Sequence, residues 1–150
     1  STPLYSSAAS DVYKRHEKIC LPIDTDRLPE NLLAGEWKFS FKKFLYDGNT
    51  DKIPRKMYTK WFDYDKIKDS LAIRNRRKGD YFVLDAAGHH KKLEDYFVNE
   101  KIPASHRDEQ LLLAGEDEIF WIVGGRMAYG TGISDATRWV LEITASNSSH

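Results

Sequence analysis

Alternation of apolar and polar residues is the clearest local pattern in the chain, and it predicts β-strands. Between Trp37 and Phe41 every second residue is aromatic, and the same spacing returns between Trp139 and Ile143. Side chains two apart lie on one face of a strand, so each run predicts a strand with one buried face. The alternation breaks after Phe41, which predicts a bulge or bend near residues 42–43.

Several shorter runs complete the strand prediction. Apolar stretches bounded by turn residues predict short strands at 61–64, 71–74 and 81–84. The continuous apolar run Ile119–Val123 is followed by Gly124-Gly125 and a returning segment at 126–129. That order predicts a β-hairpin closed by a primed turn.

Two segments have helical spacing instead. Leu93, Tyr96 and Phe97 share one helix face, which predicts an amphipathic helix over about 91–100 that ends before Pro103. Near the N-terminus, a second short helix is indicated by the spacing of Val12, Tyr13, His16, Ile19 and Cys20. His16 is interpreted there as a packing residue.

Together these elements predict an α+β fold with mainly antiparallel strands. We expect residues 1–53 to form an N-terminal segment and connector to a preceding domain, with Pro22, Pro29 and Gly35 in the connector. We expect residues 54–144 to form the domain itself and residues 145–150 a disordered tail.

Composition excludes several classes of protein. Apolar residues make up 41% and charged residues 31% of the 150, which is typical of a globular domain. No apolar run approaches the roughly 18 residues of a membrane span, and residues 1–10 have no signal-peptide pattern. The single cysteine, Cys20, forms no internal disulfide and fits a reducing, cytoplasmic setting.

Charge is balanced overall but unevenly distributed. Residues 51–107 carry fourteen basic and nine acidic residues, a balance of +5, whereas residues 108–150 carry two basic and seven acidic, a balance of −5. Such asymmetry is typical of a surface for a polyanion, although solvated charges also cluster without function.

Four of the basic residues lie within the five positions from Arg74 to Lys78. If this stretch is extended, Arg74 and Arg76 face one side and reach successive phosphates, while Gly79 lets the backbone approach. The alternative is an exposed strand that charge protects against edge pairing.

Lys91 and Lys92 stand at the start of the predicted helix, where the helix dipole disfavours cations. A phosphate bound by these lysines and free backbone N–H groups would reverse that penalty. In the alternative interpretation, Glu94 and Asp95 satisfy the dipole and the lysines have no such role.

Other polar groups have less specific spacing. Asp63, Asp65 and Asp80 could form a metal-dependent nuclease site, but we interpret them as partners of the nearby arginines. His89-His90 lacks a third ligand at a suitable spacing, so no metal site is predicted. The four tryptophans lie in strand patterns and are interpreted as core residues.

Three segments, in order, resemble the C-terminal domain of bacterial tRNA(Ile)-lysidine synthetases. They are YTKWFDYDKIKDSLAIRNRRKGDYF from Tyr58, KKLEDYFVNEKIPASHRD from Lys91, and the IFWIVGGR hairpin followed by DATRWVLEI. The matching pieces include the arginines before Gly79-Asp80, the Lys-Lys-Leu helix start, the Lys-Ile-Pro stop with a later Arg-Asp, and the final Thr-Arg strand. The resemblance covers roughly residues 54–144.

The resemblance implies a tRNA-binding accessory domain, on the acceptor-stem side, of a ligase that uses ATP with magnesium to join lysine to a wobble cytidine. The family's Ser-Gly-Gly-x-Asp-Ser loop is absent from the sequence, so we expect no catalytic residue, no cofactor in this fragment and no activity alone. The implied partners are tRNA(Ile) and the chain's own catalytic domain, with no membrane, and homodimer formation is left open. The expected tRNA-binding residues are Arg74, Arg76, Arg77, Lys78, Lys91, Lys92, Lys101, Arg107 and Arg126.

Two other functions compete with this one. The chain could be a docking module that contacts another protein, or its own catalytic domain, through the acidic end without touching RNA. It could also be a small hydrolase built on the Asp and His residues. Salt-sensitive tRNA binding would favour the tRNA-binding domain. Binding to a separate catalytic domain without RNA binding would favour the docking module, and metal-dependent turnover would favour the hydrolase.

Overall fold

The computed structural model describes residues 18–147. Its strands are β1 (Cys20–Pro22), β2 (Asn31–Ala34), β3 (Trp37–Leu45), β4 (Thr59–Asp63), β5 (Ala72–Arg74), β6 (Tyr81–Val83), β7 (His90–Lys92), β8 (Leu112–Ala114), β9 (Ile119–Ile122) and β10 (Trp139–Asn147). The helices are η1 (Thr50–Lys52), α2 (Tyr64–Ile67), α3 (Leu93–Asn99) and α4 (Ala104–Arg107). All pairings between these strands are antiparallel. The α+β class predicted from the sequence is confirmed.

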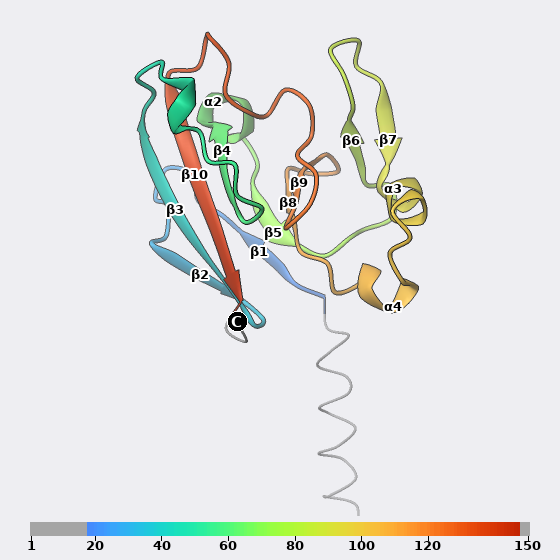
Figure 1. Cartoon of the computed structure of the whole chain (residues 1–150). Helices are drawn as coiled ribbons and strands as arrows, with labels where there is room; N and C mark the ends of the chain where they lie inside the picture. Colours follow the sequence, from blue (N-terminus) through green and yellow to red (C-terminus); the bar gives the residue numbers. More distant parts are fainter. Residues whose placement is uncertain (1–17, 148–150) are drawn as a thin grey trace, which may run out of the picture.

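The first sheet has the order β2-β3-β10-β4 and contains the two long strands (Figure 1). β3 and β10 pair without a register shift from Trp37–Asn147 to Leu45–Trp139, so the bulge predicted at residues 42–43 is wrong. The alternation breaks for another reason. Phe44 faces the outer side of the sheet and packs edge-on against Trp61, with 5.0 Å between ring centroids.

The second sheet, of order β1-β5-β8-β9, lies between two hydrophobic clusters. On β8, Leu113 belongs to the cluster shared with the first sheet, whereas Leu112 and Ala114 belong to a second cluster on the opposite face. A strand that is buried on both faces has a continuous apolar sequence, as β8 and β9 do.

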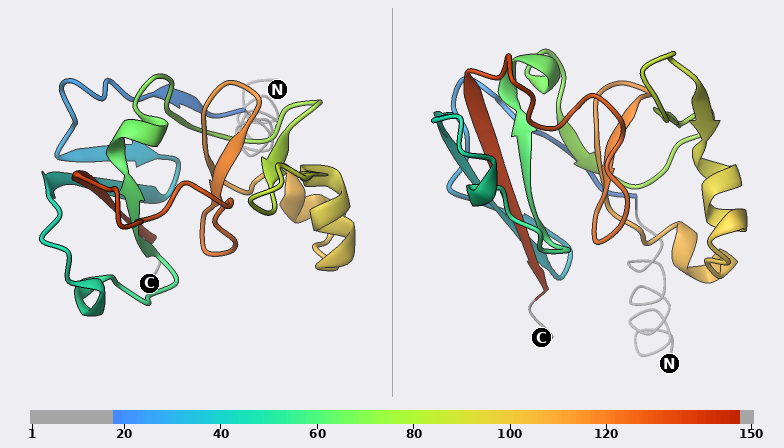
Figure 2. Two further views of the ribbon diagram at one scale, coloured as in Figure 1. Left: turned by 90° about the horizontal axis from the view of Figure 1, so that it is seen from above. Right: turned by 45° about the horizontal axis from the view of Figure 1, so that its top comes forward.

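The β6–β7 hairpin, α3 and α4 form the third layer. From above, the first sheet, the second sheet and this layer follow one another across the molecule (Figure 2). Phe82 of β6 and Leu93 and Phe97 of α3 are buried against Ile119 and Ile122 of β9. Of the basic residues singled out in the sequence, this layer carries Lys91, Lys92, Lys101 and Arg107.

The predicted amphipathic helix is present but starts later than expected. Lys91 and Lys92 belong to β7, where they pair with Phe82 and Tyr81, and α3 begins at Leu93. Lys92 is the N-cap of α3 and makes no side-chain capping bond, while Glu94 and Asp95 occupy the first turn. Lys91 and Lys92 therefore do not lie in the first helical turn.

Three other local predictions need correction. Cys20, predicted to lie in a helix, belongs to β1. Lys18 and Ile19 precede this strand, and residues 12–17 of the predicted helix fall outside the described residues. The 122–125 turn has positive φ at Gly124, its third residue, whereas a primed turn requires positive φ at the second. The segment predicted as a connector, residues 22–35, contains a strand, because Asn31–Ala34 form β2.

Strands on both sides of residue 53 share the same sheets. β3 pairs with β10, and β1 pairs with β5, so segments before and after that position are held together by backbone hydrogen bonds. β10 extends to Asn147, and residues 148–150 lie outside the described part. Among the described helices, none has the length and apolar character that crossing a membrane requires.

Candidate nucleic-acid interface

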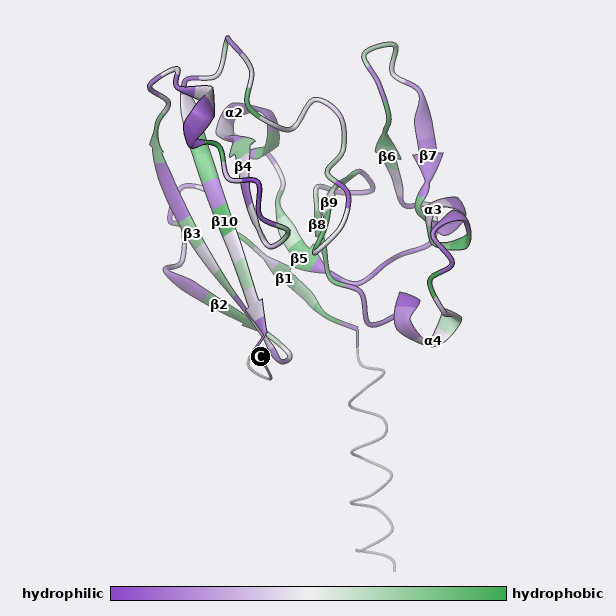
Figure 3. Ribbon diagram, viewed as in Figure 1, coloured by the Kyte–Doolittle hydropathy of each residue, from purple (hydrophilic) through white to green (hydrophobic). Residues whose placement is uncertain are grey.

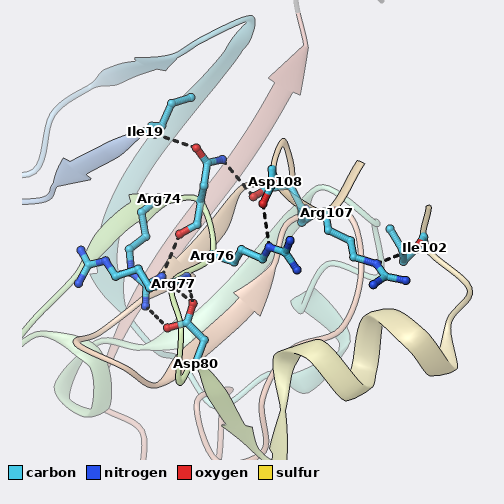
Figure 4. Close-up of polar contacts among 10 residues, drawn as sticks. Ile19, Arg74, Arg76, Arg77, Asp80, Ile102, Arg107 and Asp108 are labelled. Carbon is cyan, nitrogen blue, oxygen red and sulfur yellow. Dashed lines mark hydrogen bonds and ion pairs between the residues drawn. The ribbon is translucent and has the colours of Figure 1, made fainter. Parts of the chain in front are cut away.

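Arg74, the first arginine of the basic cluster, is buried. Its Nη1 and Nη2 donate to the two carboxylate oxygens of Asp80 at 2.9 and 2.8 Å, and both side chains are 1% exposed (Figure 4). The same nitrogens also donate to the carbonyl oxygens of Asn75 and Glu116. The expectation that Arg74 contacts a phosphate is therefore corrected, because every hydrogen-bonding end of this guanidinium is turned into the protein.

The pair nevertheless shapes the basic surface. Asp80 also accepts a hydrogen bond from the backbone N–H of Arg77 at 2.6 Å, and Gly79 between them has φ +91°. The carboxylate thus closes the turn that carries Arg76, Arg77 and Lys78. Glu116, in the turn between β8 and β9, connects this assembly to the second sheet. Within the segment, Arg74, Asn75 and Asp80 are buried, whereas Arg77 and Lys78 are exposed and Arg76 is partly exposed.

Arg76 is held from two sides and remains partly open. Its Nε donates to Oδ1 of Asp108 at 2.8 Å, and its guanidinium carbon lies 5.9 Å from the centre of the Phe97 ring. The side chain is 28% exposed. No hydrogen bond joins its Nη nitrogens to any other described residue, so four N–H donors are left for a ligand.

Arg107 is held in the same way. Its Nε donates to the carbonyl oxygen of Ile102 at 2.9 Å, and its Nη nitrogens likewise have no bond to another residue between 18 and 147. Ile102 follows α3, and Asp108, the partner of Arg76, follows Arg107 directly. Arg107 therefore lies beside the segment that leaves the C-terminal end of α3, and the carboxylate that holds Arg76 follows it in the chain (Figure 4).

Lys101 lies at that same helix end in an unusual conformation. Its φ of 56° is the one positive value among the described non-glycine residues. The N–H of Ile102 donates to the carbonyl of Phe97, and the N–H of Lys101 donates to that of Val98. This is a Schellman motif, in which glycine usually fills the position that Lys101 occupies.

Arg77 and Lys78 are exposed on the turn after β5. The Nη2 of Arg77 lies 3.2 Å from the thiol sulfur of Cys20. Within residues 18–147, the Lys78 side chain forms no hydrogen bond or ion pair. Both side chains are thus open to solvent.

Lys91, Lys92 and Arg126 are contributed by the β6–β7 hairpin and the turn after β9. Figure 3 shows β7 as hydrophilic beside the more apolar β6. The guanidinium carbon of Arg126 lies 5.4 Å from the centre of the Phe82 ring, and Lys91 is the cross-strand partner of Phe82. Directly paired residues share one face of a hairpin, so Lys91 and Arg126 lie on the same side. Lys92 is exposed on the other face.

The acidic residues have local structural partners. Asp63 caps α2 and accepts a hydrogen bond from Thr137, and Asp65 pairs with Lys68 at 3.2 Å. The sequence predicted arginine partners for all three aspartates, but only Asp80 pairs with an arginine. Residues 18–147 contain no group of three or more His, Cys, Asp or Glu arranged for a metal ion.

The two histidines of the β6–β7 hairpin also have separate environments. His89 Nδ1 lies 2.8 Å from Asp85, and this side-chain hydrogen bond lowers the pKa of the Asp85 carboxyl below its ordinary value. His90 instead stacks on Tyr81, with 4.5 Å between ring centroids.

The sequence did not point to Asp108 or Phe97 as parts of this site. Asp108 lies 32 residues from Arg76, and Phe97 has the spacing of an ordinary core residue. The only available signal was the Arg107-Asp108 pair in the second segment of the family resemblance.

The fold and the site together define a three-layer α+β domain with two anchored arginines beside α3. Residues 71–143 match the family model described as the TilS substrate C-terminal domain. The chain belongs to this family of C-terminal domains from tRNA(Ile)-lysidine synthases, which confirms the resemblance found in the sequence.

Individual relatives agree with this assignment. The tRNA(Ile)-lysidine synthase of Caldanaerobacter subterraneus is 38% identical over 104 residues, which are 69% of this chain and 22% of that protein. The one of Clostridium perfringens is 37% identical over 94 residues, 63% of this chain and 20% of that protein. The chain thus spans about a fifth of the length of these curated relatives.

A solved structure shares the fold. The crystal structure of a TilS C-terminal domain superposes with a TM-score of 0.67 at 21% identity, covering 87% of this chain and 98% of that one.

Proposed function

We propose that this domain binds tRNA(Ile) for a parent enzyme that forms lysidine, and that it contacts the acceptor-stem side. The proposal is supported by the relatives, which are tRNA(Ile)-lysidine synthases. The parent is a ligase that consumes ATP, with magnesium, and lysine in a separate catalytic domain. This chain supplies binding and no catalytic group.

The observation that carries the proposal is the pair Arg76 and Arg107. Each guanidinium is anchored through Nε, and each keeps its Nη donors free beside the other's segment. Double-stranded RNA is recognised mainly through phosphates, 2′-hydroxyls and shape. Fixed guanidinium groups suit that role because they bind phosphate oxygens in a bidentate geometry.

The proposed surface extends over the third layer. Exposed or partly exposed cations from four segments contribute to it: Arg76, Arg77, Lys78, Lys91, Lys92, Lys101, Arg107 and Arg126. Phosphate contacts of this kind position the RNA and carry little sequence information. We therefore expect specificity for tRNA(Ile) to depend on the parent's other domains.

The proposal is tested by titrating the chain with a fluorescent tRNA(Ile) transcript at several salt concentrations. Affinity should fall steeply as salt rises. An acceptor-stem minihelix should bind, whereas an isolated anticodon stem-loop should bind less tightly. Arg76→Ala/Arg107→Ala should weaken binding, and Lys38→Ala, an exposed cation of β3 in the opposite layer, serves as the matched control. Equal binding by the two variants would refute the proposed surface.

Catalysis is tested separately. The chain should form no lysidine when incubated with ATP, magnesium, lysine and tRNA(Ile), because its sequence lacks the family's nucleotide loop. Lysidine formation by the chain alone would overturn the proposed division of labour.

In the docking alternative, the contact is made by the acidic end, residues 108–150, which carries two basic and seven acidic residues. Binding to a separately produced catalytic domain, with no measurable affinity for tRNA, would favour this alternative. Sedimentation of the chain alone would show whether two copies associate.

A further inference from the structure

The Arg76–Asp108 contact has an unusual setting for a surface ion pair. Asp108 occupies one donor, Nε, and leaves both Nη groups free, while the Phe97 ring lies beneath the guanidinium. Asp108 itself is 59% exposed. A carboxylate on a phosphate-binding arginine either competes with the phosphate or fixes the arginine in its binding geometry.

The geometry points to Asp108 as a positioning residue that presets Arg76 for an RNA phosphate. This inference rests on the proposed tRNA-binding function. An arginine side chain loses considerable rotamer freedom when it binds, and an arginine that is already immobilised loses less. Asp108 occupies Nε and so leaves the edge formed by Nη1 and Nη2 open, where a phosphate can still bind in a bidentate geometry.

Arg107 provides an internal comparison. Its Nε is held by the backbone carbonyl of Ile102, which no side-chain substitution removes. The two neighbouring arginines thus use one anchoring mode with different acceptors, a carboxylate and a carbonyl. Loss of the Asp108 side chain should release Arg76 and leave Arg107 fixed.

Two variants separate positioning from competition. In Asp108→Asn, the amide oxygen still accepts from Nε, while the negative charge that repels phosphate is gone. In Asp108→Ala, both the acceptor and the charge are lost. Positioning predicts that Asp108→Ala binds the acceptor-stem minihelix about two- to tenfold less tightly than the unmodified chain, as expected for one newly immobilised side chain. It predicts that Asp108→Asn binds at least as tightly as the unmodified chain.

The mobility of the arginines is measured without RNA. Nitrogen-15 relaxation of the Nε–H groups should show faster motion of Arg76, but not of Arg107, in Asp108→Ala. Asp108 is exposed, so the fold should survive, and a thermal melt checks this.

Unchanged or tighter RNA binding by Asp108→Ala would overturn the inference, as would an Arg76 Nε–H that stays as rigid as before. If the unmodified chain does not bind RNA at all, the proposed function fails. The relaxation of the free protein then still decides whether Asp108 positions Arg76.

Discussion

Arg74 and Asp80 form a bidentate ion pair in which both side chains are 1% exposed. Removing one member of a buried pair leaves the other charge without compensation, at a cost of about 3–5 kcal/mol. We expect Asp80→Asn and Arg74→Met to lower the free energy of unfolding by amounts of this order, measured by urea denaturation. Arg76→Met, which breaks the surface pair, should cost about 1 kcal/mol or less.

The double variant Arg74→Met/Asp80→Leu tests the same pair from the other side. Replacing a whole buried ion pair with apolar residues is often much less costly than removing one partner. The double variant should therefore be more stable than the sum of the single changes predicts. Additive losses would show that the two charges are not coupled.

Lys101 is strained in its left-handed conformation. Lys101→Gly removes the steric cost of a positive φ, and the greater flexibility of glycine in the unfolded chain offsets part of that gain. The net effect should be a stabilisation of the fold by about 0.5–1 kcal/mol. If Lys101 contacts RNA, the same change should weaken tRNA binding while raising the melting temperature. Lys101→Ala is the control, since it removes the charge and keeps the strain. A less stable glycine variant would contradict this account.

Arg76 is expected to contribute one phosphate contact. Arg76→Ala should weaken binding to different tRNAs similarly and make the slope of log affinity against log salt shallower by roughly 0.7–0.9. Lys38→Ala should leave the slope unchanged. The slope is measured by anisotropy titration between low and physiological salt, and an unaltered slope in Arg76→Ala would remove this residue from the interface.

Lys91 and Lys92 lie in β7, before the first turn of α3. We expect Lys91→Gln/Lys92→Gln to change stability by about 0.5 kcal/mol or less, as is usual for surface substitutions. Binding to tRNA should weaken because charge-assisted contacts are lost. A clear fall in melting temperature with unchanged affinity would instead assign these lysines a structural role.

Lys92 also allows a change in which stability and binding move in opposite directions. As an N-cap without a side-chain hydrogen bond, it can be improved by Lys92→Ser, which should stabilise α3 by about 1 kcal/mol. The variant should still bind tRNA less tightly. Thermal melting and the tRNA titration, performed on one preparation, test both effects.

Local periodicity predicted the strands and the helix that bury one face and expose the other. The alternating residues from Trp37 and from Trp139 begin the two long paired strands, and Leu93 and Phe97 are both buried in α3. These predictions succeeded because the spacing of apolar residues follows directly from the geometry of a strand or helix. The order of three segments was sufficient to indicate the family.

Tertiary contacts decided what periodicity could not. Arg74 and Arg76 have the same charge and the spacing of one strand face, yet β5 ends at Arg74. Arg74 is then buried by Asp80 and by Glu116 from 42 residues away, while Arg76 meets Asp108 from 32 residues away. Likewise, Lys91 and Lys92 lie in a strand because their backbone pairs with β6. The sequence by itself determined the elements and the family, whereas only the folded chain decided which arginine is structural and which is free to bind, because burial depends on neighbours that are distant in sequence.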